Sequence, residues 1–339
     1  MKLTRRVFVS SALAAGHLTM SEAGGQSSRG KIHVQPLGTP PGRPEEESVF
    51  GINLSHSDFP GNVIRYRIPE CWFCGLLPFW PPPAEKIVPE TGPNLRYPFI
   101  VLGPHSTGFS KSWEQGPEGS WVGHMELPGW WSCEAIVKPE RDHVHIRSSL
   151  TNRSKWDWVE VWAHFCANND QAPDFRDVTG ERTILFLNDG LRTVDRTHRY
   201  EGVSGRKNCN TYLPVARGML MNEYLYSTPI SRDRVSSPLT IRRSASRQAL
   251  FAVCFRHYYG LFYDSAPENN CIHSEPYIGD LQAGETRTVE GHLYWFKGTV
   301  PDVVDKAREF GPCMGSVQRV TPRVCGPAPR SSKVKRENA

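Results

Sequence analysis

The chain has 339 residues, of which 38% are hydrophobic and 22% are charged, and its formal net charge is +5. This composition suits a globular protein of one large or two ordinary domains. After the N-terminus no run approaches the roughly 18 apolar residues of a membrane-spanning helix, and the modest charge, concentrated near the two ends of the chain, predicts no nucleic-acid-binding face.

Residues 1–23 have the form of a secretory signal peptide. A charged start precedes the short apolar run VFVSSALAAG, and the segment ends in Ser21-Glu22-Ala23, a small-x-small sequence of the kind that signal peptidase cuts. The adjacent Arg5 and Arg6 resemble a twin-arginine signal, and an ordinary signal with two arginines is the alternative. We expect a bacterial protein that is periplasmic or secreted, with the twin-arginine export machinery as its partner during translocation.

The rest of the chain divides into three segments. Residues 24–48 are rich in Gly, Pro, Ser and charge, which predicts a flexible linker. We expect residues 49–312 to form a single β-sandwich domain and residues 313–339 to form a largely disordered C-terminal tail. No internal repeat is evident.

Strand patterns dominate the predicted domain. Alternating runs rich in Val, Ile, Phe, Tyr and Trp are separated by clusters of Pro, Gly, Asn and Asp, while helical periodicity is clear only in residues 300–310, VPDVVDKAREF. We therefore predict an all-β fold, a large antiparallel β-sandwich with long loops and a short C-terminal helix. The predicted strands include CEAIVKP, HVHIRSSLT, WVEVWAHFC, ERTILFL, LTIRRSA, QALFAVCF and TRTVEGHLYWF.

Nine cysteines suit an oxidising compartment, and their odd number leaves at least one unpaired within the chain. Cys71 and Cys74 have the spacing of a redox or metal half-site, although no second such pair is present; a disulfide or plain buried thiols are the alternatives. Cys166, Cys254 and Cys271 lie in apolar strand-like runs, where we expect them to pack as small hydrophobic residues.

Residues 143–166, HVHIRSSLTNRSKWDWVEVWAHFC, contain three histidines. The turn-like NRSKWD separates two strand-like runs, so a hairpin is the simplest arrangement. His143 and His145 share one strand face, and a turn centred within NRSKWD places His145 directly opposite His164. The three imidazoles then form one patch, whereas a register shift of one residue would move His164 to the other face.

A second informative segment covers residues 269–296. Glu275 precedes a proline at the end of a strand-like run, and His273 lies two residues before it. We predict an active carboxylate at this position; an exposed loop glutamate is the alternative. The run Leu281 to Glu285 reads as a turn into the long strand that follows.

These two segments together resemble the galactose mutarotase-like β-sandwich group, which includes the aldose 1-epimerases. SLTNRSKWDWVEVWAHF is similar to a family segment in which a strand ends in a Thr-Asn pair, here Thr151-Asn152, and the next strand carries a functional histidine, here His164. CIHSEP, followed by a turn of the form LxxGE, is similar to the family's late segment, which carries the carboxylate base at the position of Glu275. The resemblance covers about a fifth of the chain, and the chain also resembles exported bacterial proteins of unassigned function.

Two departures from the family pattern concern activity more than fold. Phe165-Cys166-Ala167 follow His164, where the epimerases have an aromatic pair and an Asn. The family's earlier histidine has two candidates here, His124 and His105. The resemblance therefore implies the sandwich more firmly than it implies epimerase activity.

The leading functional hypothesis is an exported carbohydrate-active protein that uses acid–base chemistry of an epimerase, lyase or hydrolase kind and needs no cofactor. Glu275 would act as general base, His164 as general acid, and His145 would orient the substrate or His164. The residues expected to contact the carbohydrate or glycoside are His143, His273, Arg182, Trp130 and Trp131, the tryptophans by stacking and the arginine by binding a sugar carboxylate.

Two alternatives remain open from the sequence. The first is a divalent-metal enzyme whose ligands are His143, His145, His164 and Glu275, with His273 as a further candidate. The second is a noncatalytic carbohydrate-binding module, which would use the aromatic residues without Glu275. Metal analysis of untagged protein separates the first alternative from the leading hypothesis, and replacement of Glu275 separates the second.

Overall fold

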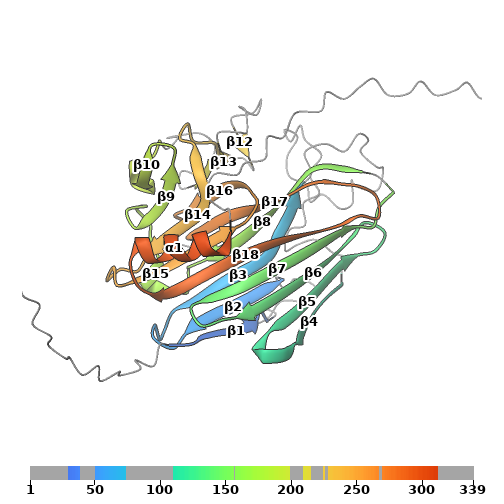
Figure 1. The fold of residues 1–339 in the computed structure, drawn as a ribbon, viewed down its shortest axis with the longest axis horizontal. Helices are drawn as coiled ribbons and strands as arrows, with labels where there is room; N and C mark the ends of the chain where they lie inside the picture. Colours follow the sequence, from blue (N-terminus) through green and yellow to red (C-terminus); the bar gives the residue numbers. More distant parts are fainter. Residues whose placement is uncertain are drawn as a thin grey trace, which may run out of the picture.

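The structure, a computed structural model, describes residues 30–38, 50–73, 110–155, 157–198, 209–214, 224–225, 228–266 and 269–311. Two large antiparallel sheets pack against each other, as Figure 1 shows, and the predicted all-β sandwich is confirmed. Among the described residues, no helix has the length and apolar character that crossing a membrane requires.

The seven-stranded sheet has the order β1-β2-β3-β8-β17-β16-β11. Its strands are β1 (Ile32–Pro36), β2 (Gly51–His56), β3 (Val63–Phe73), β8 (Trp158–Asn168), β17 (Cys271–Leu281), β16 (Tyr258–Asp264) and β11 (Cys209–Tyr212).

The nine-stranded sheet has the order β10-β9-β14-β15-β18-β7-β6-β5-β4. Its strands are β10 (Gly190–Thr193), β9 (Thr183–Leu187), β14 (Val235–Arg243), β15 (Ala249–Phe255), β18 (Thr286–Lys297), β7 (His143–Asn152), β6 (Trp131–Pro139), β5 (Trp121–Leu127) and β4 (Ser110–Gln115). Two short strands, β12 (Tyr224–Leu225) and β13 (Thr228–Pro229), pair separately, and single 3-10 turns span Pro117–Gly119, Pro173–Phe175 and Val194–Arg196.

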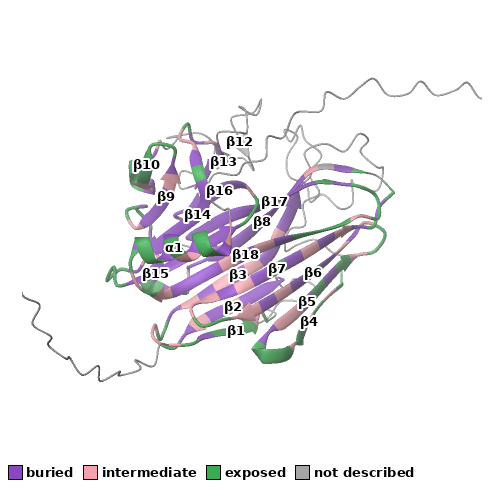
Figure 2. Ribbon diagram, viewed as in Figure 1, coloured by how far each residue is buried: buried purple, intermediate pink, exposed green. Residues whose placement is uncertain are grey.

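One hydrophobic core lies between the two sheets and takes one face of each strand. In β7, Val144 and Ile146 are buried in this core while His143 and His145 lie on the outer face. Figure 2 shows this alternation of buried and partly exposed positions along the strands of the nine-stranded sheet. Because strand side chains alternate, each sheet also presents a second, outward face, and the polar clusters described below lie on those two faces.

The predicted strands are all present, and so is the helix. The helix α1 (Val300–Phe310) begins at a capping box between Thr299 and Asp302. Its apolar side, including Val303 and Ala307, packs on the outer face of the nine-stranded sheet beside β15 (Figure 1). The helix therefore covers part of a sheet face that would otherwise be exposed and apolar.

The predicted flexible linker is wrong over residues 32–36. These residues form β1, the edge strand of the seven-stranded sheet, in which Ile32 and Val34 enter the core. A period of two over five residues was enough to make a strand despite the surrounding Gly, Pro and Ser. The predicted signal peptide and the whole of the predicted C-terminal tail lie outside the described residues, as do Cys74 and His105.

The predicted hairpin between β7 and β8 is also wrong. β7 pairs with β6 and β18 in the nine-stranded sheet, so both of its edges are occupied. β8 belongs to the other sheet, where it pairs with β3 and β17. His145 therefore faces His292 of β18 rather than His164, and the predicted imidazole patch does not form.

The turn-like segment after β7 is instead a connection between the two sheets, and Asn152 holds it in place. The buried Asn152 side chain accepts hydrogen bonds from Ser154 and donates one to the carbonyl of Leu281. Its backbone is hydrogen-bonded to Gly284 and Glu285. The turn from β17 into β18 also passes between the sheets, so Asn152 joins the two connections that cross from one sheet to the other.

Replacing Asn152 with Ala should destabilise the fold by about 2–4 kcal/mol, because the carbonyl of Leu281 and the Ser154 amide each lose a partner in a buried place. Urea unfolding followed by circular dichroism measures this difference. Thr151→Ala is the matched control, since its hydroxyl bonds to Thr286 at an exposed position, and a loss below about 0.5 kcal/mol is expected there. An equal, small effect of both substitutions would contradict the role given to Asn152.

Candidate functional site

The structure brings His164 and Glu275 together on the outward face of the seven-stranded sheet. β8 and β17 are neighbours, and the register that pairs Ala167 with Ile272 and Trp162 with Tyr277 places His164 opposite Glu275. Nδ1 of His164 donates a hydrogen bond of 2.6 Å to Oε1 of Glu275. The predicted meeting of these two residues, more than a hundred positions apart, is confirmed.

Glu275 is a buried carboxylate with two dissimilar oxygen atoms. Oε1 accepts the hydrogen bond from His164 and lies 3.3 Å from Nδ1 of His273. Oε2 is also buried, and it has no hydrogen-bond partner among the residues that the structure describes. Buried polar atoms in folded proteins nearly always have a partner, so an unpaired carboxylate oxygen marks this position as unusual.

Glu70 of β3 lies on the other side of His164. Its Oε2 is 3.7 Å from Nε2 of His164, and its second oxygen pairs with the guanidinium of Arg67. The Glu70 side chain is 21% exposed, against 2% for Glu275. His164 therefore bridges a buried carboxylate and a more accessible one, and its Nε2 faces the accessible side.

The charges in this cluster shift the pKa values of its members. Burial raises the pKa of Glu275, and the nearby His164 offsets this in part. Burial by itself lowers the pKa of His164, but the charge and hydrogen bond of Glu275, together with Glu70, outweigh it, so that pKa is raised. Burial and the charge of His164 lower the pKa of His273 well below its usual range, so this second imidazole stays neutral.

Aromatic rings continue the same sheet face next to the pair. The ring of Trp162, two residues before His164, is stacked on Phe73 at 4.1 Å and on Tyr259 at 4.4 Å. Tyr277, two residues after Glu275, packs against Tyr259 and is partly exposed. A buried cluster of rings therefore borders the acid–base pair on one side, with Tyr277 as its partly exposed member.

His143 and His145 lie on the opposite outer face of the molecule, beyond the shared core. There they contact His292 of β18, with ring centroids 4.2 Å and 5.3 Å apart, and His292 stacks on Phe310 of α1. The expectation that His145 orients His164 is wrong, as is the contact of His143 with a substrate of that site. A metal site that combines either residue with His164 and Glu275 is excluded by the same separation.

Three further residues expected to bind substrate have other places. Trp131 is fully buried in the core between the sheets, and Trp130 packs against that core. β6 starts at Trp131 with this side chain directed into the core, and the neighbouring Trp130 ring packs against it. The Arg182 guanidinium donates hydrogen bonds to the backbone carbonyls of Asp174, Arg176 and Arg243. The prediction for Trp131 is therefore wrong, whereas substrate contacts of Trp130 and Arg182 stay predictions.

His273 does lie in the cluster, as a buried neighbour of Glu275. The interpretation of the sequence missed four other members, namely Arg67, Glu70, Cys166 and Cys271. A signal for the two cysteines was present, because Cys166 follows His164 by two residues and Cys271 precedes His273 by two. In a strand this spacing puts each cysteine on the same face as its histidine.

No protein-family model matches this chain, and no curated protein matches it. Solved structures with a similar architecture include a galactose mutarotase-like protein from Clostridium acetobutylicum, with 10% identity, a TM-score of 0.42 and coverage of 74% of this chain and 92% of that chain. A Synechocystis protein has 9% identity, a TM-score of 0.42 and coverage of 74% and 91%. Galactose 1-epimerase from Lactobacillus acidophilus has 10% identity, a TM-score of 0.38 and coverage of 79% and 99%.

The Clostridium and Lactobacillus proteins bear names of the galactose mutarotase-like group that the sequence resembles. A similarity at this level of identity and TM-score assigns neither an activity nor a residue role to this chain.

The histidine trio on the outer face predicts a dependence of stability on pH. Burial, then the charges of His143, His145 and Arg256, lower the pKa of His292 to about 3. In the unfolded chain His292 titrates near 6.5, so between these values the unfolded state binds more protons than the folded state. Stability should therefore be highest above about pH 6.5 and fall as the pH drops toward 3.

Thermal unfolding between about pH 7 and pH 5 measures this dependence. The charged groups around the three histidines are Asp142, Glu290, Arg256 and Lys306. All four residues are kept in both variants that are compared with the wild type. His292→Gln should reduce the slope, because the buried His273 still contributes to it, whereas His124→Gln, at a half-exposed position on β5, should leave it as in the wild type. An unchanged slope in His292→Gln would show that other groups cause all of it.

Proposed function

We propose that this chain acts on a sugar or glycoside by acid–base chemistry, with Glu275 and His164 as the reacting pair. The observation that carries the proposal is the buried cross-strand pair, in which His164 is hydrogen-bonded to one oxygen of Glu275 and the other oxygen has no partner among the described residues. A carboxylate fixed at one oxygen and unpaired at the other is arranged to accept a hydrogen bond, and then a proton, from a substrate hydroxyl.

The proposed roles follow from the positions of the polar atoms. Oε2 of Glu275 takes a proton from a sugar hydroxyl or ring carbon, and the carboxylate becomes a carboxylic acid. The imidazolium of His164 donates a proton from Nε2, on the side of Glu70, to a ring or leaving oxygen. One proton enters the site and one leaves it, as sugar ring opening or β-elimination requires, and the raised pKa values of both groups suit this exchange near neutral pH.

Two features favour a carbohydrate as the substrate. Tyr277, two residues from Glu275, is a partly exposed ring on which the C–H face of a sugar can pack, and the buried rings of Trp162 and Tyr259 support it from behind. The resemblance of the sequence implies the same substrate class. Export through the twin-arginine route, predicted from residues 1–23, belongs to the same proposal and would place the activity outside the cytoplasm.

Replacing Glu275 with Gln should reduce turnover by about 10²–10⁴-fold while leaving carbohydrate binding within a few-fold, because the amide keeps the shape but cannot take up a proton. Turnover is measured by nuclear magnetic resonance of anomeric and reducing-end signals over a panel of free sugars and glycosides, and binding by calorimetry. His164→Asn should lose turnover to a similar extent.

Glu290→Gln is the matched control, since this glutamate lies on β18 in the other sheet and pairs with Arg256. It should turn over the same substrate at the wild-type rate. Unchanged turnover and unchanged binding in Glu275→Gln would refute the enzyme assignment. Binding without turnover by the wild type, across the panel, would indicate a noncatalytic carbohydrate-binding module.

A further inference from the structure

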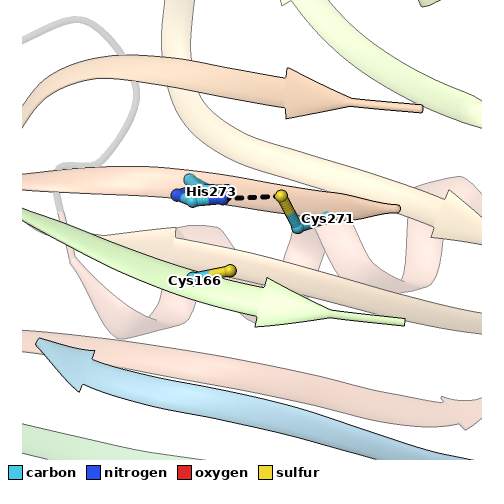
Figure 3. Close-up of side chains that lie close together, drawn as sticks. All are labelled: Cys166, Cys271 and His273. Carbon is cyan, nitrogen blue, oxygen red and sulfur yellow. Dashed lines mark hydrogen bonds between the residues drawn. The ribbon is translucent and has the colours of Figure 1, made fainter. Parts of the chain in front are cut away.

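Two thiols and an imidazole meet beside the acid–base pair, on the same face of the seven-stranded sheet. They belong to Cys166 of β8 and to Cys271 and His273 of β17 (Figure 3). Nε2 of His273 and Sγ of Cys271 are 3.0 Å apart, and one potential ligand atom from each of the three residues lies within 4.8 Å of the others. All three side chains are buried, and His273 is fully so.

The strand geometry holds these three donors together. Cys271 and His273 are two residues apart on one strand, so both point to the same face. The register between β8 and β17 places Cys166 opposite His273, on a strand that is itself paired on both sides. The donors are thus carried by central strands rather than by loops, which is the arrangement that keeps a ligand set in position.

The chemistry of the donors selects a class of cation. Thiolate and imidazole are the ligands preferred by zinc and by monovalent copper, whereas magnesium and calcium prefer oxygen. Two thiolates and one divalent cation form a centre with no net charge, which suits a buried place better than a charged centre does. Zinc therefore fits this site better than monovalent copper.

The far side of His273 lies next to a carboxylate. Its Nδ1 is 3.3 Å from Oε1 of Glu275 and makes no hydrogen bond with any of the described residues. Histidines that bind a metal through one nitrogen typically donate the other N–H to a carboxylate. A cation on Nε2 would fix the proton on Nδ1 and direct it at Glu275.

We propose that Cys166, Cys271 and His273 bind a zinc ion next to Glu275. A neighbouring set, His164, His273 and Glu275, has equally close donor atoms. In that set, however, Nδ1 of His164 and Oε1 of Glu275 already bind each other, so a cation would have to break this hydrogen bond. The cysteine set also contains a hydrogen bond, between Nε2 of His273 and Sγ of Cys271, but it offers two sulfur donors and an imidazole, the ligand types of structural zinc sites. The proposal does not depend on the acid–base function, because metal content is measured without a substrate.

The test uses the full chain, purified without an affinity tag under reducing conditions. Elemental analysis should find about one zinc per chain, and titration of the metal-free protein against a chromogenic chelator gives the affinity. Cobalt substituted for zinc should show thiolate-to-cobalt charge-transfer absorption. Cys166→Ser and Cys271→Ser should each weaken zinc binding by at least about 100-fold.

Cys133→Ser is the matched control, because Cys133 is an equally buried thiol in the other sheet, bonded to Ser148. It should bind zinc as the wild type does. Near-ultraviolet circular dichroism shows whether each variant is folded. If the cysteine variants do not fold, the cobalt spectrum of the wild type shows whether thiolates bind the metal.

Four results would overturn the proposal. They are a folded wild type without thiolate-to-cobalt absorption, a disulfide between Cys166 and Cys271 in the purified protein, copper in place of zinc, and zinc binding that is lost in His164→Asn but retained in both serine variants.

Discussion

The shared core between the two sheets is the constraint on which the rest of this molecule depends. Each strand must give one face to that core, so residues at every second position are directed away from it. On the seven-stranded sheet the outward face carries the buried carboxylate, imidazoles and thiols, and on the nine-stranded sheet it carries the histidine trio and α1. Residues that are close in sequence therefore separate to opposite sides of the sandwich, while distant ones converge.

The convergence of His164 and Glu275 has energetic consequences that neither residue has alone. A carboxylate taken out of water prefers to be protonated and a buried imidazole prefers to be neutral, but side by side each favours the charged form of the other. The single hydrogen bond between them compensates for part of the desolvation of both. Glu70, on the accessible side of His164, and His273, on the buried side of Glu275, extend the pair in two directions. A zinc ion bound to His273, as proposed, would act on Glu275 through the neighbouring Nδ1 of His273. The acid–base proposal and the zinc proposal therefore concern one continuous cluster.

Local sequence patterns predict some residues of the site and not others. His164 and Glu275 were recognised from two short segments, because both local patterns resemble a known sandwich family. The expected place of His145 in the same patch requires the assumption that the turn after β7 closes a hairpin. That assumption failed because the turn, with Asn152 bonded to the β17–β18 connection, takes the chain across to the other sheet. Trp131 failed for a related reason, since an aromatic ring suited to stacking on a sugar is suited equally to a core, and its strand register directs it inward.

The sequence alone predicted the all-β architecture, the run of strands, the C-terminal helix and the pairing of one histidine with one distant glutamate. These depend on local periodicity, on turn residues and on short patterns, which are properties of neighbouring positions. Only the tertiary structure decided which strands share a sheet, and hence that Cys166, Cys271 and His273 meet while His143 and His145 do not join them. Strand pairing joins segments that are remote in sequence, and a strand's own residues do not record which neighbour will occupy its edges.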